Sequence, residues 1–336
     1  MTPDIAKQLL FQMRRIRHVE LEIARRYSEG KMRCPTHLSV GQEAVAAAVG
    51  LALQNSDLAV SGHRAHAHYL GKGGSLSAML AEIYGKIGGC SRGKGGSMHL
   101  IDESVGFMGS TAIVGGTIPV GVGLAYGMKC KRTDQVSCIF HGDAAVETGV
   151  FFESVNFAAV KKLPVLFLCE NNLYSVYSSL SVRQPEGRSI AKMVEGLGIK
   201  TGSGNGNDVA EVYAKTSEAL ASIRVGGGPQ LLEFSTYRWL EHCGPNFDND
   251  IGYRTEAEFL NWKAKEPIGH FESALLASGV VSVAEVAQMD LNIGREVSEA
   301  FEFADASPFP TAESAYTDLY HFESSAAGIQ PESMGA

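Results

Sequence analysis

The chain has 336 residues, of which 45% are hydrophobic and 20% are charged, and its formal net charge is −8. A chain of this length and apolar content can bury a large core, so we do not expect disorder over most of it. The acidic balance leaves no basic surface of the kind that binds nucleic acid or an anionic membrane. These bounds favour a protein that acts on small molecules.

No segment approaches the roughly 18 uninterrupted apolar residues of a membrane-spanning helix, and the N-terminal residues lack the apolar run of a signal peptide. We therefore expect a cytoplasmic protein. The six cysteines form no CxxC pair and no spacing typical of a metal site, so they predict neither disulfides nor structural zinc.

Two helices and a glycine-rich loop are predicted in the N-terminal part of the chain. Residues 4–28 carry helical periodicity and are followed by Gly30. Residues 41–53 are mostly alanine and valine with almost no charge, which predicts a buried helix. Glycines crowd together in residues 85–99, which is typical of a loop whose backbone passes close to another group.

The central part of the chain predicts a βαβ unit. Its strands are residues 136–140 and 164–169, and the helix between them is residues 150–160. A third apolar strand, residues 230–236, follows a predicted helix at residues 208–223. This order predicts an α/β fold with a doubly wound, mostly parallel sheet flanked by helices.

Two further helices, at residues 271–276 and 283–303, predict a helical C-terminal segment. We expect one domain from residue 1 to residue 322. The last residues, 323–336, are mostly small or polar and are expected to form a flexible tail.

Polar side chains follow two of the predicted strands. Asp143 comes just after the first strand and Asn172 just after the second. Ligands bind beyond the carboxyl ends of parallel strands, and neighbouring strands are about 4.8 Å apart, so the two side chains can meet at one ion. Carboxylate and amide oxygens suit Mg²⁺, which completes its shell with water and phosphate oxygens.

We expect this ion to bind a diphosphate. Gly142 allows a sharp turn before Asp143, and a helix beginning near Thr148 or Gly149 would aim free N–H groups at an anion. Taken singly, Asp143 also fits a helix cap and Asn172 a turn residue. Their placement at one edge of the sheet favours the metal site.

The segment from Gly142 to Ser178, which begins GDAAVETG and ends CENNLYSVYS, closely resembles the thiamine-diphosphate signature of the alpha subunits of 2-oxo acid dehydrogenases. These include the pyruvate, acetoin and branched-chain types. The resemblance continues over nearly the whole chain and implies the diphosphate-binding domain of the thiamine-diphosphate-binding fold. The other matching blocks are HLSVGQEA, HRAH, GCSRGKGGSMH, IVGGTIPVGVGLA, GNDV and YRWLEHCGP.

The resemblance implies roles for the residues around the diphosphate. Asp143 and the Asn172 side chain would coordinate Mg²⁺ together with the backbone carbonyl of Tyr174. Gly142 and Ala145 would lie along the diphosphate.

Three further positions near the diphosphate include departures from the family pattern. Arg64 would pair with diphosphate oxygens, for which a guanidinium fork is well suited. His63 stands where the family commonly has tyrosine and could contact a phosphate. Ala144 replaces the usual second glycine, which adds a methyl group where backbone and cofactor meet.

Four residues match the parts of the family that surround the reacting half of the cofactor. Val114 would support the bent cofactor, although it also fits a plain core valine. His242 matches the loop histidine that reaches the reacting centre, and it is our main catalytic candidate. His66 is a second catalytic candidate near the cleft. His99 would line the cofactor cleft or serve as an ordinary loop histidine.

The same resemblance implies a shared active site. A beta subunit would supply the pyrimidine-binding domain and the glutamate that activates the cofactor, in an α₂β₂ assembly. The substrate would be a 2-oxo acid that is decarboxylated, or an acyloin such as acetoin that is cleaved. The acyl group would pass to the lipoyl domain of an acyltransferase.

Three other readings remain open. A split carboligase resembling transketolase would use the same chemistry to transfer a C2 unit, and a non-catalytic scaffold subunit would keep the fold alone. A nicotinamide-binding protein is disfavoured because the glycines of residues 121–127 lie in a helical segment, where close helix packing explains them.

Overall fold

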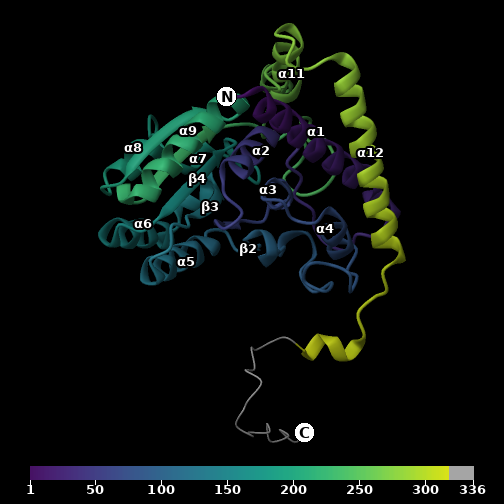
Figure 1. Cartoon of the computed structure of the whole chain (residues 1–336), viewed down its shortest axis with the longest axis horizontal. Coiled ribbons are helices and arrows are strands. Elements are labelled where there is room, and N and C mark those ends of the chain that lie inside the picture. The colour runs from purple at the N-terminus through teal and green to yellow at the C-terminus, as the bar shows by residue number, and fades with distance from the viewer. Residues whose placement is uncertain (318–336) are drawn as a thin grey trace, which may run out of the picture.

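A six-stranded sheet forms the centre of the structure (Figure 1). The computed structural model of the chain describes residues 1–317, so the predicted tail and the last five residues of the predicted domain lie outside the described residues. The strand order is β2-β1-β3-β4-β8-β7, and each of these neighbouring pairs is parallel. The strands are β1 (Leu58–Ser61), β2 (Phe107–Ser110), β3 (Ser137–Gly142), β4 (Val165–Asn171), β7 (Lys200–Asn205) and β8 (Gln230–Ser235), and a separate antiparallel pair is formed by β5 (Tyr174–Ser175) and β6 (Ser178–Ser179).

Helices cover both faces of this sheet. Helices α5, α6 and α8 contribute to the core on one face, and α1, α2, α3 and α9 contribute to the core on the other. The helices are α1 (Pro3–Arg26), α2 (Glu43–Ala52), α3 (His66–Gly71), α4 (Leu76–Ile83), α5 (Thr117–Lys131), α6 (Gly149–Lys161), α7 (Leu180–Arg183), α8 (Ile190–Glu195), α9 (Val209–Ser222), α10 (Glu256–Lys263), α11 (Pro267–Ala277) and α12 (Val283–Ala306).

Successive side chains of β3 and β4 point alternately into the two cores on opposite faces of the sheet. In β3, Cys138 and Phe140 belong to one core and Ile139 to the other, and β4 alternates in the same way. Strands buried on both faces read as continuous apolar runs, which is why these strands were predictable. The predicted doubly wound α/β fold with a helical C-terminal segment is confirmed.

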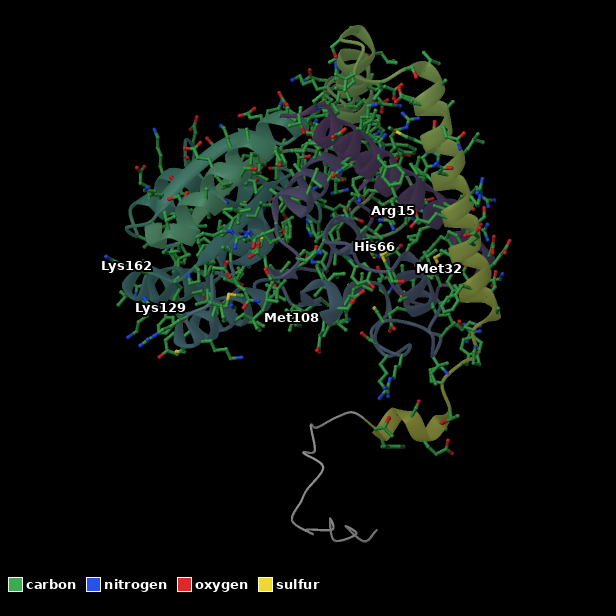
Figure 2. All side chains as sticks on the ribbon, viewed as in Figure 1. Arg15, Met32, His66, Met108, Lys129 and Lys162 are labelled. Carbon is green, nitrogen blue, oxygen red and sulfur yellow. The ribbon has the colours of Figure 1, made fainter. Side chains whose placement is uncertain are left out.

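The C-terminal helix α12 runs beside α1 (Figure 1). It begins with a capping box in which Ser282 and Glu285 satisfy each other's backbone N–H groups. Arg15 of α1 donates three hydrogen bonds from its side chain to Glu296, at 2.6–3.1 Å, and Figure 2 shows Arg15 between the two helices. Arg14 pairs with Asp290 in the same way. The first and last α-helices of the described residues are thereby joined.

The glycine-rich loop wraps around one buried carboxylate. Glu82 of α4 is fully buried, and its Oε2 accepts hydrogen bonds from the backbone N–H groups of Ser91 (2.7 Å) and Gly93 (2.9 Å). Its Oε1 accepts two more from Gly95 and Gly96. A Cβ atom at Gly89 would collide with the same carboxylate. The group that the loop backbone was predicted to approach is therefore Glu82.

Replacing Glu82 with alanine is expected to lower the free energy of unfolding by at least about 3 kcal/mol, because several backbone donors lose a charged acceptor at once. Urea unfolding followed by circular dichroism measures this change. Glu302→Ala, at an exposed position of the same residue type, is the control and should change stability by less than about 0.5 kcal/mol. Equal stabilities for the two variants would show that Glu82 does not organise the loop.

The glycines of α5 have different environments. A Cβ atom at Gly121 would collide with the Ile139 side chain, so the predicted close packing of helix on sheet is confirmed there. Gly123 and Gly127 face open space, and for them the packing prediction is wrong. Among residues 1–317, no helix is both long enough and apolar enough to cross a membrane.

Candidate active site

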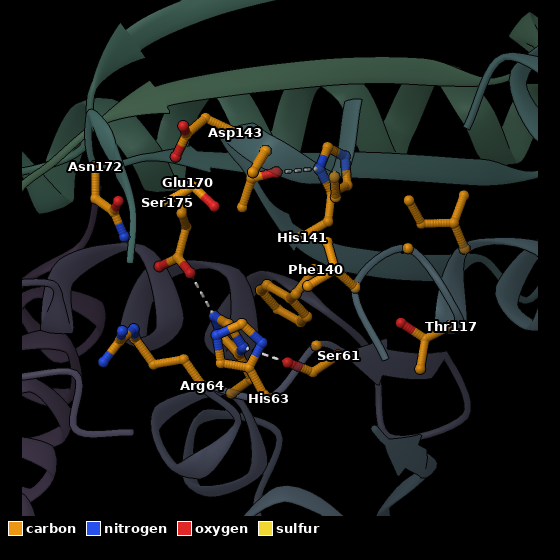
Figure 3. A pocket seen from close by; sticks show the side chains of 18 of the residues that line it. Ser61, His63, Arg64, Thr117, Phe140, His141, Asp143, Glu170, Asn172 and Ser175 are labelled. Atoms are coloured by element: carbon orange, nitrogen blue, oxygen red, sulfur yellow. Dashed lines mark hydrogen bonds and ion pairs between the residues drawn. The ribbon is translucent and has the colours of Figure 1, made fainter. Parts of the chain in front are cut away.

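A pocket of about 730 Å³, counting its part open to solvent, lies at the carboxyl ends of β1, β3 and β4 (Figure 3). The chain leaves β1 towards β2 on one side and returns to β3 on the other, so the pocket lies at the switch point of the sheet, where ligands bind in such folds. The predicted site residues that line the pocket are His63, Arg64, Val114, Gly142, Asp143, Ala144, Ala145, Asn172, Tyr174 and His242.

Asp143 and Asn172 lie on the same side of this pocket (Figure 3). Both side chains are buried, and Asn172 Oδ1 accepts a hydrogen bond of 3.4 Å from the Tyr174 backbone N–H. On its other side, Asn172 Nδ2 donates to Gln42 Oε1 at 3.4 Å. The three residues predicted as magnesium ligands are thus brought together by the ends of β3 and β4.

The Asp143 carboxylate already has a cationic partner. Burial raises the pKa of Asp143, and the hydrogen bond and charge of Arg183 oppose that rise. Arg183, at the end of α7, also pairs with Glu147. A buried carboxylate that needs a positive charge beside it, with an amide oxygen nearby, fits a hard divalent cation. Arg183 was missed from the sequence, because it reaches Asp143 only through the folded α7.

The turn between Asn172 and Tyr174 is strained. Leu173 has φ of +73°, a left-handed conformation that is uncommon for a residue with a side chain. Tyr174 is held beyond the turn by its hydroxyl, which donates to Glu258 at 2.9 Å. Strain of this kind is concentrated at functional sites, where surrounding contacts maintain it.

Gly142 was predicted to allow a sharp turn through the conformational freedom of glycine, and this role is wrong. Gly142 has φ of −84°, which any residue can adopt, so its conformational freedom is not used. A Cβ atom there would have no neighbour within 4 Å, so glycine instead leaves open space beside the pocket. Ala144 does not have a positive φ either, and its methyl group therefore fits without backbone strain.

The predicted start of α6 near Thr148 or Gly149 is confirmed, but this helix N-terminus does not line the pocket. A 3₁₀ turn, Asp143–Glu147, separates β3 from α6, and Thr148 and Gly149 do not line the pocket. The backbone that faces the pocket is the beginning of the 3₁₀ turn. Residues 143–147 separate the N-terminus of α6 from the end of β3, so the turn residues rather than the helix N-terminus line the pocket.

Arg64 connects two loops at the side of the pocket through hydrogen bonds. Its guanidinium donates to the backbone carbonyls of Leu38 (2.6 Å) and His242 (3.1 Å). Burial, followed by the charge of Arg64, lowers the pKa of His63 to about 4 and that of His242 to about 3. Both imidazoles are therefore neutral at pH 7 and can accept a proton or a hydrogen bond.

A buried chain of hydrogen bonds reaches the pocket beside Phe140. His68 Nδ1 lies 2.8 Å from Ser61 Oγ, and its Nε2 lies 2.9 Å from Glu170 Oε2. The His68 ring stacks on Phe140 with centroids 4.0 Å apart. His68 and Glu170 line the pocket and were missed, although a carboxylate at the end of a buried strand was a usable signal.

His141 is a further pocket residue that was missed from the sequence. It is buried, burial lowers its pKa to about 4, and its Nε2 has no hydrogen-bond partner among the described residues. Its Nδ1 lies 3.2 Å from the carbonyl of Gly142 (Figure 3). A neutral imidazole nitrogen without a partner is a polar group available to a ligand.

Two predicted site histidines do not line the pocket. His66 lies in the interior (Figure 2), where its Nδ1 is 3.0 Å from Glu20 Oε2 and its Nε2 is 2.7 Å from Ser97 Oγ. Both nitrogens are engaged, so the geometry supports a structural role for His66. His99 is exposed, with Nδ1 2.9 Å from the carbonyl of Gly95.

Comparison with known proteins gives one consistent family. The model of the family described as "Dehydrogenase E1 component" matches residues 11–313. The pyruvate dehydrogenase E1 component subunit alpha of Rickettsia bellii is 36% identical over 305 residues, which cover 91% of this chain and 92% of the relative. The subunit of the same name from Rhizobium meliloti is 34% identical over 309 residues (92% and 88%). The chloroplastic subunit alpha-3 of Arabidopsis thaliana is 38% identical over 293 residues (85% and 68%).

These matches extend over both faces of the sheet, the pocket and the C-terminal helices. They agree with the family that the sequence motifs indicated. The chain therefore belongs to the dehydrogenase E1 component family, as an alpha subunit of the thiamine-diphosphate-dependent 2-oxo acid dehydrogenases.

Proposed function

We propose that this chain binds the diphosphate half of thiamine diphosphate through Mg²⁺ and takes part in the decarboxylation of pyruvate. The observation that carries the proposal is the buried group of Asp143, Asn172 and Tyr174 at the switch point of the sheet. The names of the relatives support pyruvate as the substrate.

The residues of the pocket divide into binding and proton-handling groups. Asp143, the Asn172 side chain and the Tyr174 carbonyl would hold Mg²⁺, and the start of the 3₁₀ turn would lie along the diphosphate. When bound, thiamine diphosphate supplies an electron sink for cleavage of the bond next to a carbonyl. His242 is positioned as a neutral imidazole that can accept or return a proton.

The other components of the reaction would come from partners. We expect a beta subunit to supply the pyrimidine-binding domain and the activating glutamate in an α₂β₂ assembly. A lipoyl acyltransferase would receive the acyl group. The name "subunit alpha" of the relatives supports the first of these partners.

Reconstitution with a beta subunit tests the proposal. The chain and its beta subunit, with thiamine diphosphate and Mg²⁺, should reduce an artificial electron acceptor when pyruvate is added. The chain alone should be inactive, because the activating glutamate is absent. Full activity of the chain alone would refute the shared site. Faster turnover of acetoin would assign the acetoin type, and C2 transfer between sugar phosphates would assign a carboligase.

A further inference from the structure

Three histidine rings from three separate loops converge beside the pocket. The ring centroids of His37 and His63 are 4.5 Å apart, those of His37 and His242 are 4.9 Å apart, and those of His63 and His242 are 5.3 Å apart. One ligand nitrogen from each ring lies within 4.8 Å of the other two. His37 and His242 are 205 positions apart in the sequence, so only the fold assembles this cluster.

The nitrogens of the cluster are free to act as ligands. His37 Nδ1 is buried and has no hydrogen-bond partner among the described residues. Burial, followed by the charge of Arg64, lowers the pKa of all three rings, that of His37 to about 2. Neutral imidazole is the form that binds a metal.

The loops that carry the rings are held together by their backbones. Arg64, next to His63, donates hydrogen bonds to two backbone carbonyls. One belongs to Leu38, which follows His37 in the sequence, and the other belongs to His242 itself. Gly244 N–H donates to the Thr36 carbonyl at 2.9 Å, and this bond joins the His37 loop to the His242 loop. The ligand positions are therefore fixed before any ion arrives, which lowers the cost of assembling a site.

We propose that His37, His63 and His242 form a site for a divalent transition-metal ion of the zinc type, distinct from the oxygen-ligand site at Asp143. Three imidazoles with an open fourth position are a ligand set that zinc accepts, whereas Mg²⁺ prefers oxygen ligands. Small movements of the rings bring three nitrogens to a common ion. Because His242 lines the pocket, an occupied site engages its imidazole and inhibits the enzyme reversibly.

Zinc binding by the full-length chain tests the proposal without the cofactor. Calorimetry with Zn²⁺ at pH 7, in the presence of excess Mg²⁺, is expected to show one site that Mg²⁺ does not displace. His63→Tyr and His242→Asn should each weaken this site at least about tenfold, the lower end of what even outer-shell changes cost at metal sites. His270→Asn, at an exposed histidine outside the cluster, should leave it unchanged. Melting temperatures of all variants verify that they are folded.

Two further measurements separate this site from its competitors. Co²⁺ in place of Zn²⁺ should give the visible absorption of a tetrahedral nitrogen site, and His63→Tyr should abolish that absorption. Cys243 is exposed and adjacent to His242, so Cys243→Ser controls for binding by a thiol. Zinc binding that is lost in Cys243→Ser and retained in His63→Tyr would overturn the proposal. So would equal affinity in the wild type and both histidine variants.

Discussion

Replacing Asp143 with alanine is expected to weaken the binding of thiamine diphosphate with Mg²⁺ at least about 100-fold. The expected loss of affinity exceeds the loss that is usual for changes outside the ligand shell of a metal site. The reason is that Asp143 would be the only carboxylate among the three predicted ligands. Calorimetric titration of the cofactor into the chain with Mg²⁺ measures the change. Unchanged affinity would remove Asp143 from the metal site.

The matched control for this variant is Glu147→Ala. Glu147 shares the guanidinium of Arg183 with Asp143 but is exposed and does not line the pocket. Loss of Glu147 disturbs Arg183 and leaves the predicted ligands in place. The control should therefore bind the cofactor within a few-fold of the wild type. If both variants lost binding equally, the effect of Asp143→Ala would come from the position of Arg183.

Replacing His242 with alanine is expected to lower kcat about 10²–10⁴-fold in the complex with the beta subunit, which is the usual contribution of a general acid or base. Cofactor affinity should change little, because His242 belongs to a different loop from the predicted metal ligands. Steady-state kinetics on pyruvate and calorimetry on the cofactor separate these two effects. A loss of cofactor binding with normal kcat at saturation would assign His242 to binding instead.

His270→Ala is the control for the kinetic measurement. His270 is exposed, and its Nε2 lies 2.7 Å from the Ala264 carbonyl, outside the pocket. Its removal should leave kcat unchanged. A similar fall in kcat for both variants would indicate a general effect of histidine removal and would count against a catalytic role for His242.

Strands β3, β4 and β8 could be predicted from the sequence, and β1, β2 and β7 could not. Strands β3, β4 and β8 are largely buried and read as continuous apolar runs. In contrast, β1 and β2 have only four residues each, and β7 is a polar, glycine-containing strand with mostly exposed or half-buried residues. Such strands form because a neighbour supplies their hydrogen bonds, which no local pattern records.

The candidate site was predictable where its residues follow a strand directly. Asp143 and Asn172 satisfy that rule, and the structure places them together. Arg183 and His37 were missed, because they reach the site through tertiary contacts of segments that carry no strand-end signal. His66 was chosen for its motif, and its engagement by two buried partners could not be read from neighbouring residues.

One carboxylate of the first helix ties distant segments to each other. Glu20 is fully buried in α1, and besides its contact with His66 it accepts a hydrogen bond of 3.0 Å from the Ser39 backbone N–H. His66 in turn contacts Ser97 in the glycine-rich loop. Losing one member would leave the others buried without partners, which is costly. Over evolution, Glu20, His66 and Ser97 are therefore expected to change together, so their covariation among relatives would record this network.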